Sequence, residues 1–255
     1  MVHYDLLIRN GRVLDAESGF DETADVAVTD GVIERIEPNI DPAQAQDSID
    51  ATGQWVMPGM IDTHVHVANA ADLGRIRGLG LQMVAAAGAT TVIDLGGSME
   101  ALVAGMTARG SGVNVGSLGY LKPGETVPEG RLSPDAVDEI VARALEAGSL
   151  GIKLWGGYYP FTPDETARFI ATANKMAAYV AFHVGTTETG SRLDGLREVP
   201  GLIGSTGRLH IAHINAYTRG SILSIEEEIQ EALSIVDSLR DQVVSEVHLA
   251  RPNFT

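Results

Sequence analysis

Two histidines two residues apart end the most informative stretch of the sequence. His64 and His66 close the segment Pro-Gly-Met-Ile-Asp-Thr-His-Val-His over residues 58–66. Residues two apart in a strand share a face, so both imidazoles would point the same way. Two imidazoles at that spacing can chelate one divalent cation, with Zn–N distances of about 2.0–2.1 Å. The pair alone is a weak signal, because two polar positions on an amphipathic strand give the same spacing.

A lysine interrupts a second apolar run. Lys153 stands in Leu-Gly-Ile-Lys-Leu-Trp over residues 150–155, and lysine is almost never fully buried without a partner. One reading pairs its ammonium with a carboxylate inside the fold. The other is that its amine, which burial neutralises readily, has reacted with CO2. The resulting carbamate would offer oxygens able to bridge two metals.

Two further histidines lie near the ends of later apolar runs. Lys153, His183 and His213 are spaced by 30 and then 30 residues, so one would fall at equivalent depth on each of three consecutive repeats. Such residues converge on one site. His210 and His213 are three apart and would face opposite sides of a strand. We assign His213 to the inside because it lies later in that strand.

The elements that must position these side chains follow a repeat of about 30 residues, the size of one βα unit in a parallel barrel. Strands are predicted to end near residues 66, 97, 121, 157, 186, 216 and 249. Helices are predicted over 73–87, 98–108, 134–147, 163–176 and 224–239. The expected fold is therefore an α/β, (β/α)8 TIM-type barrel, of which residues 58–255 contain seven strands.

Residues 1–57 have a different pattern, with short strands separated by turn signals. A strand is predicted over 4–9, a tight turn at Asn10-Gly11, and a strand again over 12–14. A hairpin follows, with strands over 24–28 and 32–36. This part is predicted to be a small β module ahead of the barrel.

Composition excludes several classes of function. The chain has 255 residues, 44% of them hydrophobic, and a formal net charge of −16, which disfavours nucleic acid and anionic membranes as partners. It contains no cysteine, so disulfides and thiolate metal ligands are excluded. The start has no secretory pattern, and no apolar run is long enough to span a membrane. We expect a cytoplasmic protein.

Together, the 58–66 segment, Lys153, His183 and His213 resemble the amidohydrolase superfamily, in particular its binuclear branch of hydantoinases, dihydropyrimidinases and dihydroorotases. The resemblance covers essentially the whole chain and implies that residues 1–57 are part of a small β-sandwich. It implies two divalent metal ions, zinc being expected, one on His64 and His66 and the other on His183 and His213. Carboxylated Lys153 would bridge them, and a hydroxide held between the metals would attack the substrate carbonyl.

The resemblance also suggests roles around the metals. Tyr158 matches a tyrosine that helps to stabilise the developing oxyanion in hydantoinases, and Tyr159 is its rival. Arg219, on the loop after the sixth strand, could bind a substrate carboxylate or be an ordinary surface arginine, and Asn215 is a second candidate for substrate binding. Asp62 shares the face of His64 and could orient it, and Glu246 and His248 share one face of the seventh strand, where they could support the metal ligands or bind substrate.

The predicted activity is metal-dependent hydrolysis of a non-peptide C–N bond in a small-molecule amide, cyclic amide or imide, or N-acyl compound. Deaminase, enamidase or lactonase chemistry on the same site is the first alternative. A non-catalytic scaffold like the metal-free relatives of dihydropyrimidinases is the second. The family's general base is an aspartate at the end of the eighth strand. Because residues 58–255 are predicted to contain seven of the eight strands, we predict that a second polypeptide supplies the eighth strand and its aspartate. We also expect an oligomer.

Overall fold

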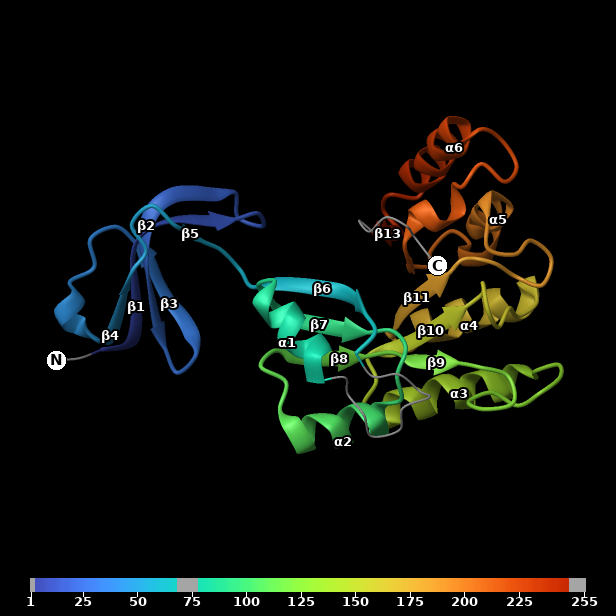
Figure 1. Ribbon diagram of the computed structural model, residues 1–255, viewed down its shortest axis with the longest axis horizontal. Helices are drawn as coiled ribbons and strands as arrows, with labels where there is room; N and C mark the ends of the chain where they lie inside the picture. Colours follow the sequence, from blue (N-terminus) through green and yellow to red (C-terminus); the bar gives the residue numbers. More distant parts are fainter. Residues whose placement is uncertain (1–2, 68–77, 248–255) are drawn as a thin grey trace. The chain divides into compact units, whose positions relative to one another are not determined.

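The computed structural model describes residues 3–67 and 78–247. The chain divides into two compact units, Met1–Met60 and Ile61–Thr255, against a sequence prediction of 1–57 and 58–255. Figure 1 shows short strands in the first unit and alternating strands and helices in the second. Among the described residues, no helix is long and apolar enough to cross a membrane.

The first unit is a single sheet of five strands. Its order is β3-β2-β1-β4, and β5 also pairs with β1. The predicted hairpin is confirmed, because β2 and β3 pair antiparallel. A sandwich of two sheets stays a prediction. The strands are β1 (Tyr4–Asp15), β2 (Phe20–Thr29), β3 (Val32–Glu37), β4 (Ala45–Asp50) and β5 (Trp55–Val56), with the short 3-10 helix η1 (Pro42–Gln44) before β4.

The tight turn predicted at Asn10-Gly11 is wrong. Both residues lie inside the continuous strand β1, where the register with β2 shifts between Ile8 and Gly11. Asn10 has a φ of 61°, and its backbone N–H donates to the Asp25 carboxylate at 2.7 Å. The left-handed conformation that asparagine tolerates is therefore used for a β-bulge. A dipeptide signal cannot separate a bulge from a hairpin turn.

The second unit is α/β with parallel sheets, as predicted. One sheet has the order β6-β7-β8, and the other has the order β13-β12-β11-β10-β9. The strands of the five-stranded sheet are all parallel to their neighbours, as are β7 and β8. The strands are β6 (Met60–Val65), β7 (Ala89–Asp94), β8 (Asn114–Ser117), β9 (Gly119–Leu121), β10 (Gly151–Trp155), β11 (Tyr179–His183), β12 (Leu209–Ile211) and β13 (Val243–Ser245).

Helices follow the strands at the predicted places. Ser133 and Thr162 cap α3 and α4 with their side-chain oxygens, and a proline begins each helix. Among the described α-helices, the sequence pattern missed α5, which contains Pro200. The helices are α1 (Gly78–Ala86), α2 (Met99–Arg109), α3 (Pro134–Glu146), α4 (Pro163–Lys175), α5 (Leu193–Ile203) and α6 (Ile225–Ser238), and the 3-10 helix η2 (Ile214–Tyr217) follows β12.

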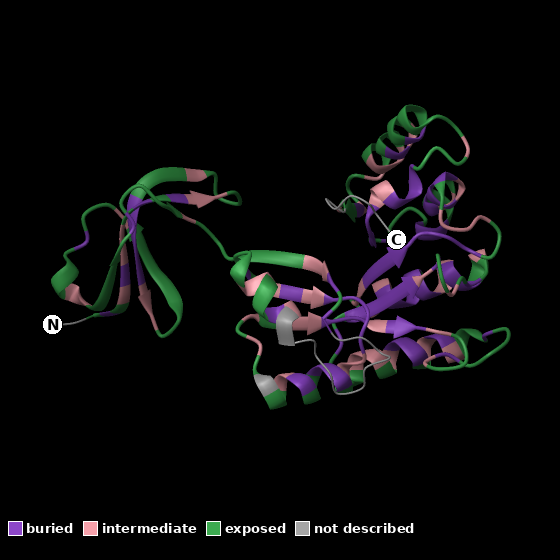
Figure 2. Cartoon of the chain, in the orientation of Figure 1, coloured by how far each residue is buried: buried purple, intermediate pink, exposed green. Residues whose placement is uncertain are grey.

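Among the described residues of the second unit, the third predicted strand is divided into β8 and β9 at Leu118. The predicted end of the seventh strand near residue 249 lies outside the described residues. The largest core cluster lies between the five-stranded sheet and its helices, with Ile152, Phe169 and Ile211 fully buried. Figure 2 shows this burial along β10 and β11. Strands β6 and β13 each end a sheet, and none of the described strands joins those two edges. Barrel closure and a second polypeptide that supplies the eighth strand stay predictions.

Candidate active site

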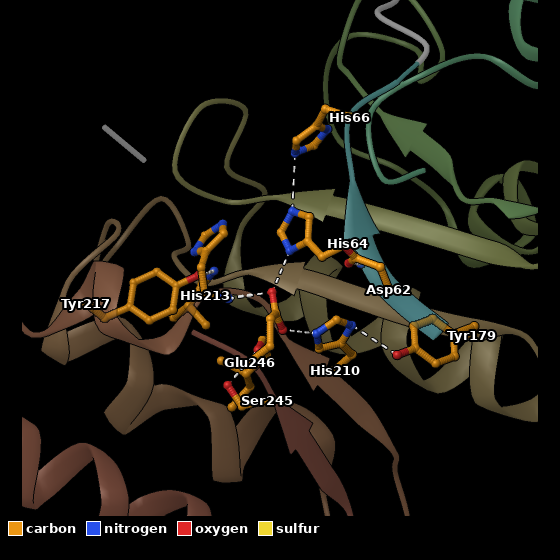
Figure 3. Close-up of polar contacts among 11 residues, drawn as sticks. Asp62, His64, His66, Tyr179, His210, His213, Tyr217, Ser245 and Glu246 are labelled. Atoms are coloured by element: carbon orange, nitrogen blue, oxygen red, sulfur yellow. Dashed lines mark hydrogen bonds and ion pairs between the residues drawn. The ribbon is translucent and has the colours of Figure 1, made fainter. Parts of the chain in front are cut away.

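Four of the predicted metal ligands form a continuous row of imidazoles in the second unit. The ring centroids are 5.1 Å apart between His66 and His64 and 5.3 Å apart between His64 and His213. The His213 and His183 centroids are 4.6 Å apart. His64 and His66 come from the end of β6 and His213 from the turn after β12 (Figure 3). His183 is the last residue of β11. Side chains more than a hundred residues apart are thus gathered as predicted. Their roles as ligands stay a prediction.

The first histidine pair has the geometry of two ligands to one cation. The His64 Nε2 and His66 Nε2 atoms are 3.2 Å apart. Two nitrogens bound tetrahedrally at 2.0–2.1 Å would be about 3.4 Å apart. Gly96 is needed beside this pair, because a Cβ there would lie 2.4 Å from His66 Nδ1.

Lys153 is buried without a hydrogen-bond partner for its amine within the described residues. Its relative exposure is 2%, and its Nζ makes no hydrogen bond there. Burial lowers the pKa of Lys153 to about 7, although the nearby Glu246 charge raises it. This disfavours the reading in which Lys153 is a plain ammonium paired to a carboxylate. A large share of neutral amine at pH 7 fits the predicted carbamate.

The depth of Lys153 differs from the sequence expectation. Lys153 is level with Ala181 in the sheet, and it is Trp155 that is level with His183. The 30-residue spacing therefore does not place Lys153 and His183 at the same height. Two residues of strand rise by about 6.6 Å, and the four-carbon stem of lysine spans much of that rise. A lysine must start lower than a histidine to bring its end group to the same level.

The expectation that His210 faces away from His213 is also wrong. Ala181 is level with His210, so His210 shares the sheet face of Lys153. The strand β12 ends at Ile211, and His213 has φ 36° and ψ 63°, outside the strand conformation. Strand alternation therefore does not extend to His213. Both histidines face Glu246, His210 through its ring and His213 through its backbone N–H.

The chemistry of the donor set fits two cations only if Lys153 is modified. Within residues 3–67 and 78–247, no group of three or more His, Cys, Asp or Glu side chains is arranged to hold a metal ion. The predicted set gives each cation two imidazoles, and its shared oxygens would come from the carbamate. His183 Nε2 is 2.8 Å from Ser191 Oγ. Its Nδ1 would be the ligand while that hydrogen bond is made.

Two acidic residues hold the backbone around the first pair. The Asp62 carboxylate accepts from the His64 backbone N–H at 3.1 Å, so Asp62 contacts the main chain of His64, and its predicted orienting role stays a prediction. Asp94, fully buried at the end of β7, accepts from the backbone N–H groups of Val67, Gly96 and Gly97 at 2.6–2.8 Å. The sequence analysis left Asp94 without a role, because an aspartate on the second strand is too generic a signal.

Glu246 is a third acid at the site, after the end of β13. Its carboxylate lies 2.5 Å from His64 Nδ1 and also accepts from the His210 ring. Burial raises the pKa of Glu246, but these hydrogen bonds outweigh it and keep the pKa well below its usual range. His248, predicted beside it, lies outside the described residues.

The two candidate tyrosines after β10 face different neighbours. The Tyr158 ring centroid is 5.3 Å from that of His183, and the residue is 58% exposed. The Tyr159 ring stacks on Trp155 and lies under the Lys122 ammonium. Tyr158 therefore borders the imidazoles, whereas Tyr159 is held by other contacts. Gly157, which precedes Tyr158, is packed against His183, because a Cβ at Gly157 would lie 2.1 Å from His183 Nε2.

The loop after η2 carries the predicted substrate residues. Asn215 is half-buried within η2, and Arg219 is exposed just beyond it. Tyr217, which the sequence analysis missed, is fully buried against the rings of His183 and His213. The loop is fixed by Glu228 of α6.

We expect Glu228→Gln to lower stability by about 1–3 kcal/mol at pH 7, because the amide opposes donors that the carboxylate satisfies. Glu228 is fully buried and accepts from the backbone N–H groups of Gly220, Ile222 and Leu223 at 2.7–3.2 Å. Burial raises the pKa of Glu228, yet these bonds hold it below 4.5 overall. Its contribution is therefore present above the unfolded-state pKa and is lost as pH falls through the lower folded-state value. Urea unfolding of both proteins from pH 7 to pH 3 should show their difference shrinking, and a difference that grows on acidification would contradict this.

Comparison with known proteins finds sequence relatives for part of the chain. No family model matches the chain. A dihydroorotase from Trichlorobacter lovleyi is 43% identical over 63 residues, which are 25% of this chain and 15% of that protein. A dihydroorotase from Streptococcus pneumoniae serotype 4 is 51% identical over 61 residues, 24% of this chain and 14% of that protein. The matched segments are thus a small part of these relatives.

Solved structures extend the likeness to the whole fold. A D-hydantoinase superposes with a TM-score of 0.64 at 20% identity and covers 98% of this chain and 61% of its own. The predicted resemblance to dihydroorotases and hydantoinases is confirmed by these two comparisons. An N-acyl-D-glutamate deacylase from Bordetella bronchiseptica, solved with zinc and a phosphonate inhibitor, has a TM-score of 0.69 at 20% identity. It covers 97% of this chain and 59% of its own. This amidohydrolase-like chain therefore spans less than two thirds of both structures.

Proposed function

We propose that this chain carries the metal-binding half of a hydrolase that cleaves a non-peptide C–N bond in a cyclic amide, imide or N-acyl compound. The observation that carries the proposal is the row of imidazoles in the second unit, formed by His66, His64, His213 and His183. The same unit buries the Lys153 amine, which has no hydrogen-bond partner in the part of the chain that the structure describes. The names of the relatives support the substrate class, since they include dihydroorotases, a hydantoinase and a deacylase. A closed (β/α)8 barrel is part of the proposal.

His64 and His66 would hold one divalent cation and His183 and His213 the other, with carboxylated Lys153 between them. When bound, such metals supply an activated water and polarise the carbonyl that it attacks. Zinc suits four imidazoles, as a borderline cation. The buried rings of His183 and His213 have relative exposures of 4% and 3%, which limits competing water on that side.

Other residues of the chain would bind and orient the substrate. Tyr158 is exposed beside His183, so its hydroxyl could donate to an oxygen that becomes negative in the transition state. Arg219 is exposed on the loop that Glu228 fixes, where its guanidinium could bind a substrate carboxylate. Asn215 lies within η2, immediately after His213 and Ile214, and could add a hydrogen bond.

The proposal is tested by metal content and activity together. Native mass spectrometry of protein purified without chelator should show two divalent metals per chain, and it would reveal a companion polypeptide at the same time. Hydrolysis of dihydroorotate, hydantoins and N-acyl amino acids should be lost after dialysis against a chelator and restored by zinc. Protein that holds less than one metal per chain would contradict the binuclear site. A fully active preparation that contains only this chain would contradict the second polypeptide and its aspartate.

Two alternatives give different results in the same experiments. A deaminase-like site with one metal would show unmodified Lys153 and a single cation. A non-catalytic scaffold would show neither metal nor hydrolysis. The unpaired amine and the paired imidazoles favour the binuclear hydrolase over both.

A further inference from the structure

The carboxylate of Glu246 binds three histidines of the second unit and, through one of them, a tyrosine. Glu246 Oε1 is 2.5 Å from His64 Nδ1 and accepts from the His213 backbone N–H at 2.8 Å. Its other oxygen contacts His210 Nε2, and His210 Nδ1 is 3.0 Å from the Tyr179 hydroxyl. Figure 3 shows this chain running from Tyr179 through His210 and Glu246 to His64. The side chains of His64 and His210 are 4% and 2% exposed, so water competes little for these bonds.

The chemistry of these groups fixes the direction of the hydrogen bonds. An ionised carboxylate only accepts, so the nitrogens that face it, His64 Nδ1 and His210 Nε2, must each carry hydrogen. In the neutral ring, His64 Nε2 then keeps its lone pair, and this is the atom 3.2 Å from His66 Nε2. Neutral His210 accepts at Nδ1 from the Tyr179 hydroxyl. The donor and acceptor of each hydrogen bond in this series are therefore set by the neighbouring bond.

The same carboxylate also constrains the second predicted metal pair. His213 has a φ of 36°, a backbone conformation that residues with a side chain rarely adopt. Its N–H donates to Glu246, and the Ile214 N–H donates to the Glu246 carbonyl at 2.9 Å. Glu246 thus binds the ring of His64 in the first predicted metal pair and the backbone of His213 in the second.

We propose that Glu246 is a positioning residue that sets the tautomer and orientation of His64 and the backbone of His213, and that Tyr179 and His210 hold its carboxylate in place. This inference rests on the proposed metal site for its effect on binding, but the tautomer of His64 does not depend on metal. Partners of this kind typically change metal affinity 10–100-fold when removed.

The experiment combines ring NMR of metal-free protein with metal affinity from competition against a chromophoric chelator, using Zn²⁺ and Co²⁺. Wild-type protein should show His64 with hydrogen on Nδ1. Glu246→Ala should lose that preference and bind metal about 10–100-fold more weakly. Tyr179→Phe removes the hydroxyl that bonds His210, two hydrogen bonds away from Glu246. It should therefore weaken metal binding less than Glu246→Ala does and leave the fold intact. Glu246→Gln can keep His64 and His213 on its oxygen, so affinity should largely survive while His210 changes tautomer.

Glu165→Gln is the matched control, because Glu165 is a buried carboxylate that accepts from Leu132 N–H and the Thr162 cap of α4, not from the imidazoles. It should change stability but not metal affinity. The proposal is overturned if wild-type His64 carries hydrogen on Nε2, or if Glu246→Ala and Tyr179→Phe leave tautomer and affinity unchanged. Should Glu246→Ala fail to fold, Glu246→Gln and Tyr179→Phe decide by the same measurements. If wild-type protein has the expected tautomer but binds neither metal, the positioning role stands and the proposed metal site fails.

Discussion

Lys153→Ala should remove most of the bound metal and reduce hydrolysis to the level of chelator-treated protein. The proposed carbamate is the one ligand shared by both cations, so losing it leaves each with two imidazoles. Metal analysis after gel filtration, together with the hydrolysis assay, measures both effects. A short added carboxylate such as acetate or propionate should restore part of the activity, since it can occupy the space that the side chain leaves.

Lys153→Met separates the loss of the amine from the loss of volume. Methionine fills the buried position without nitrogen, and it should be at least as stable as metal-free wild type, because burial of the lysine already lowers its pKa to about 7. Intact protein mass in bicarbonate buffer should show the added CO2 on wild type and not on this variant. Full metal content in Lys153→Met would rule out the bridging role, as would a wild-type mass without the adduct.

Tyr158→Phe should lower kcat by about 10²-fold or more, the usual cost of one lost oxyanion donor, with little change in metal content. We expect this loss because the Tyr158 ring lies against His183 and the residue is 58% exposed, so its hydroxyl can reach a bound substrate. Steady-state kinetics on the best substrate of the assay, with metal analysis of the same samples, gives the measurement.

Tyr159→Phe is the natural comparison for that variant. Tyr159 stacks on Trp155 at a centroid distance of 5.9 Å and lies under Lys122, so we expect this rival candidate to contribute less to the reaction than Tyr158. Its kcat should stay within about twofold of wild type. A large effect at Tyr159 with none at Tyr158 would transfer the oxyanion role, and no effect at either would leave it to the metals.

Much of the architecture and the four imidazoles were predictable from sequence, because both depend on local regularities. A repeat of about 30 residues fixes alternating strands and helices, and parallel strands bring their carboxyl ends to one face. Residues near those ends, such as His66 and His183, must therefore approach one another. Helix α5 was missed because Pro200 and two glycines obscure its periodicity.

Register and hydrogen bonding were decided only by the tertiary structure. Spacing along the chain counts residues but not the offset between neighbouring strands, so Lys153 was assigned to the height of His183 and is in fact level with Ala181. The end of β12 at Ile211 freed His213 from strand alternation, so that His210 and His213 both contact Glu246. The sequence by itself determined that the four imidazoles come together. Only packing determined which of them hold the others, because a carboxylate such as Glu246 takes its partners from strands far apart in the chain.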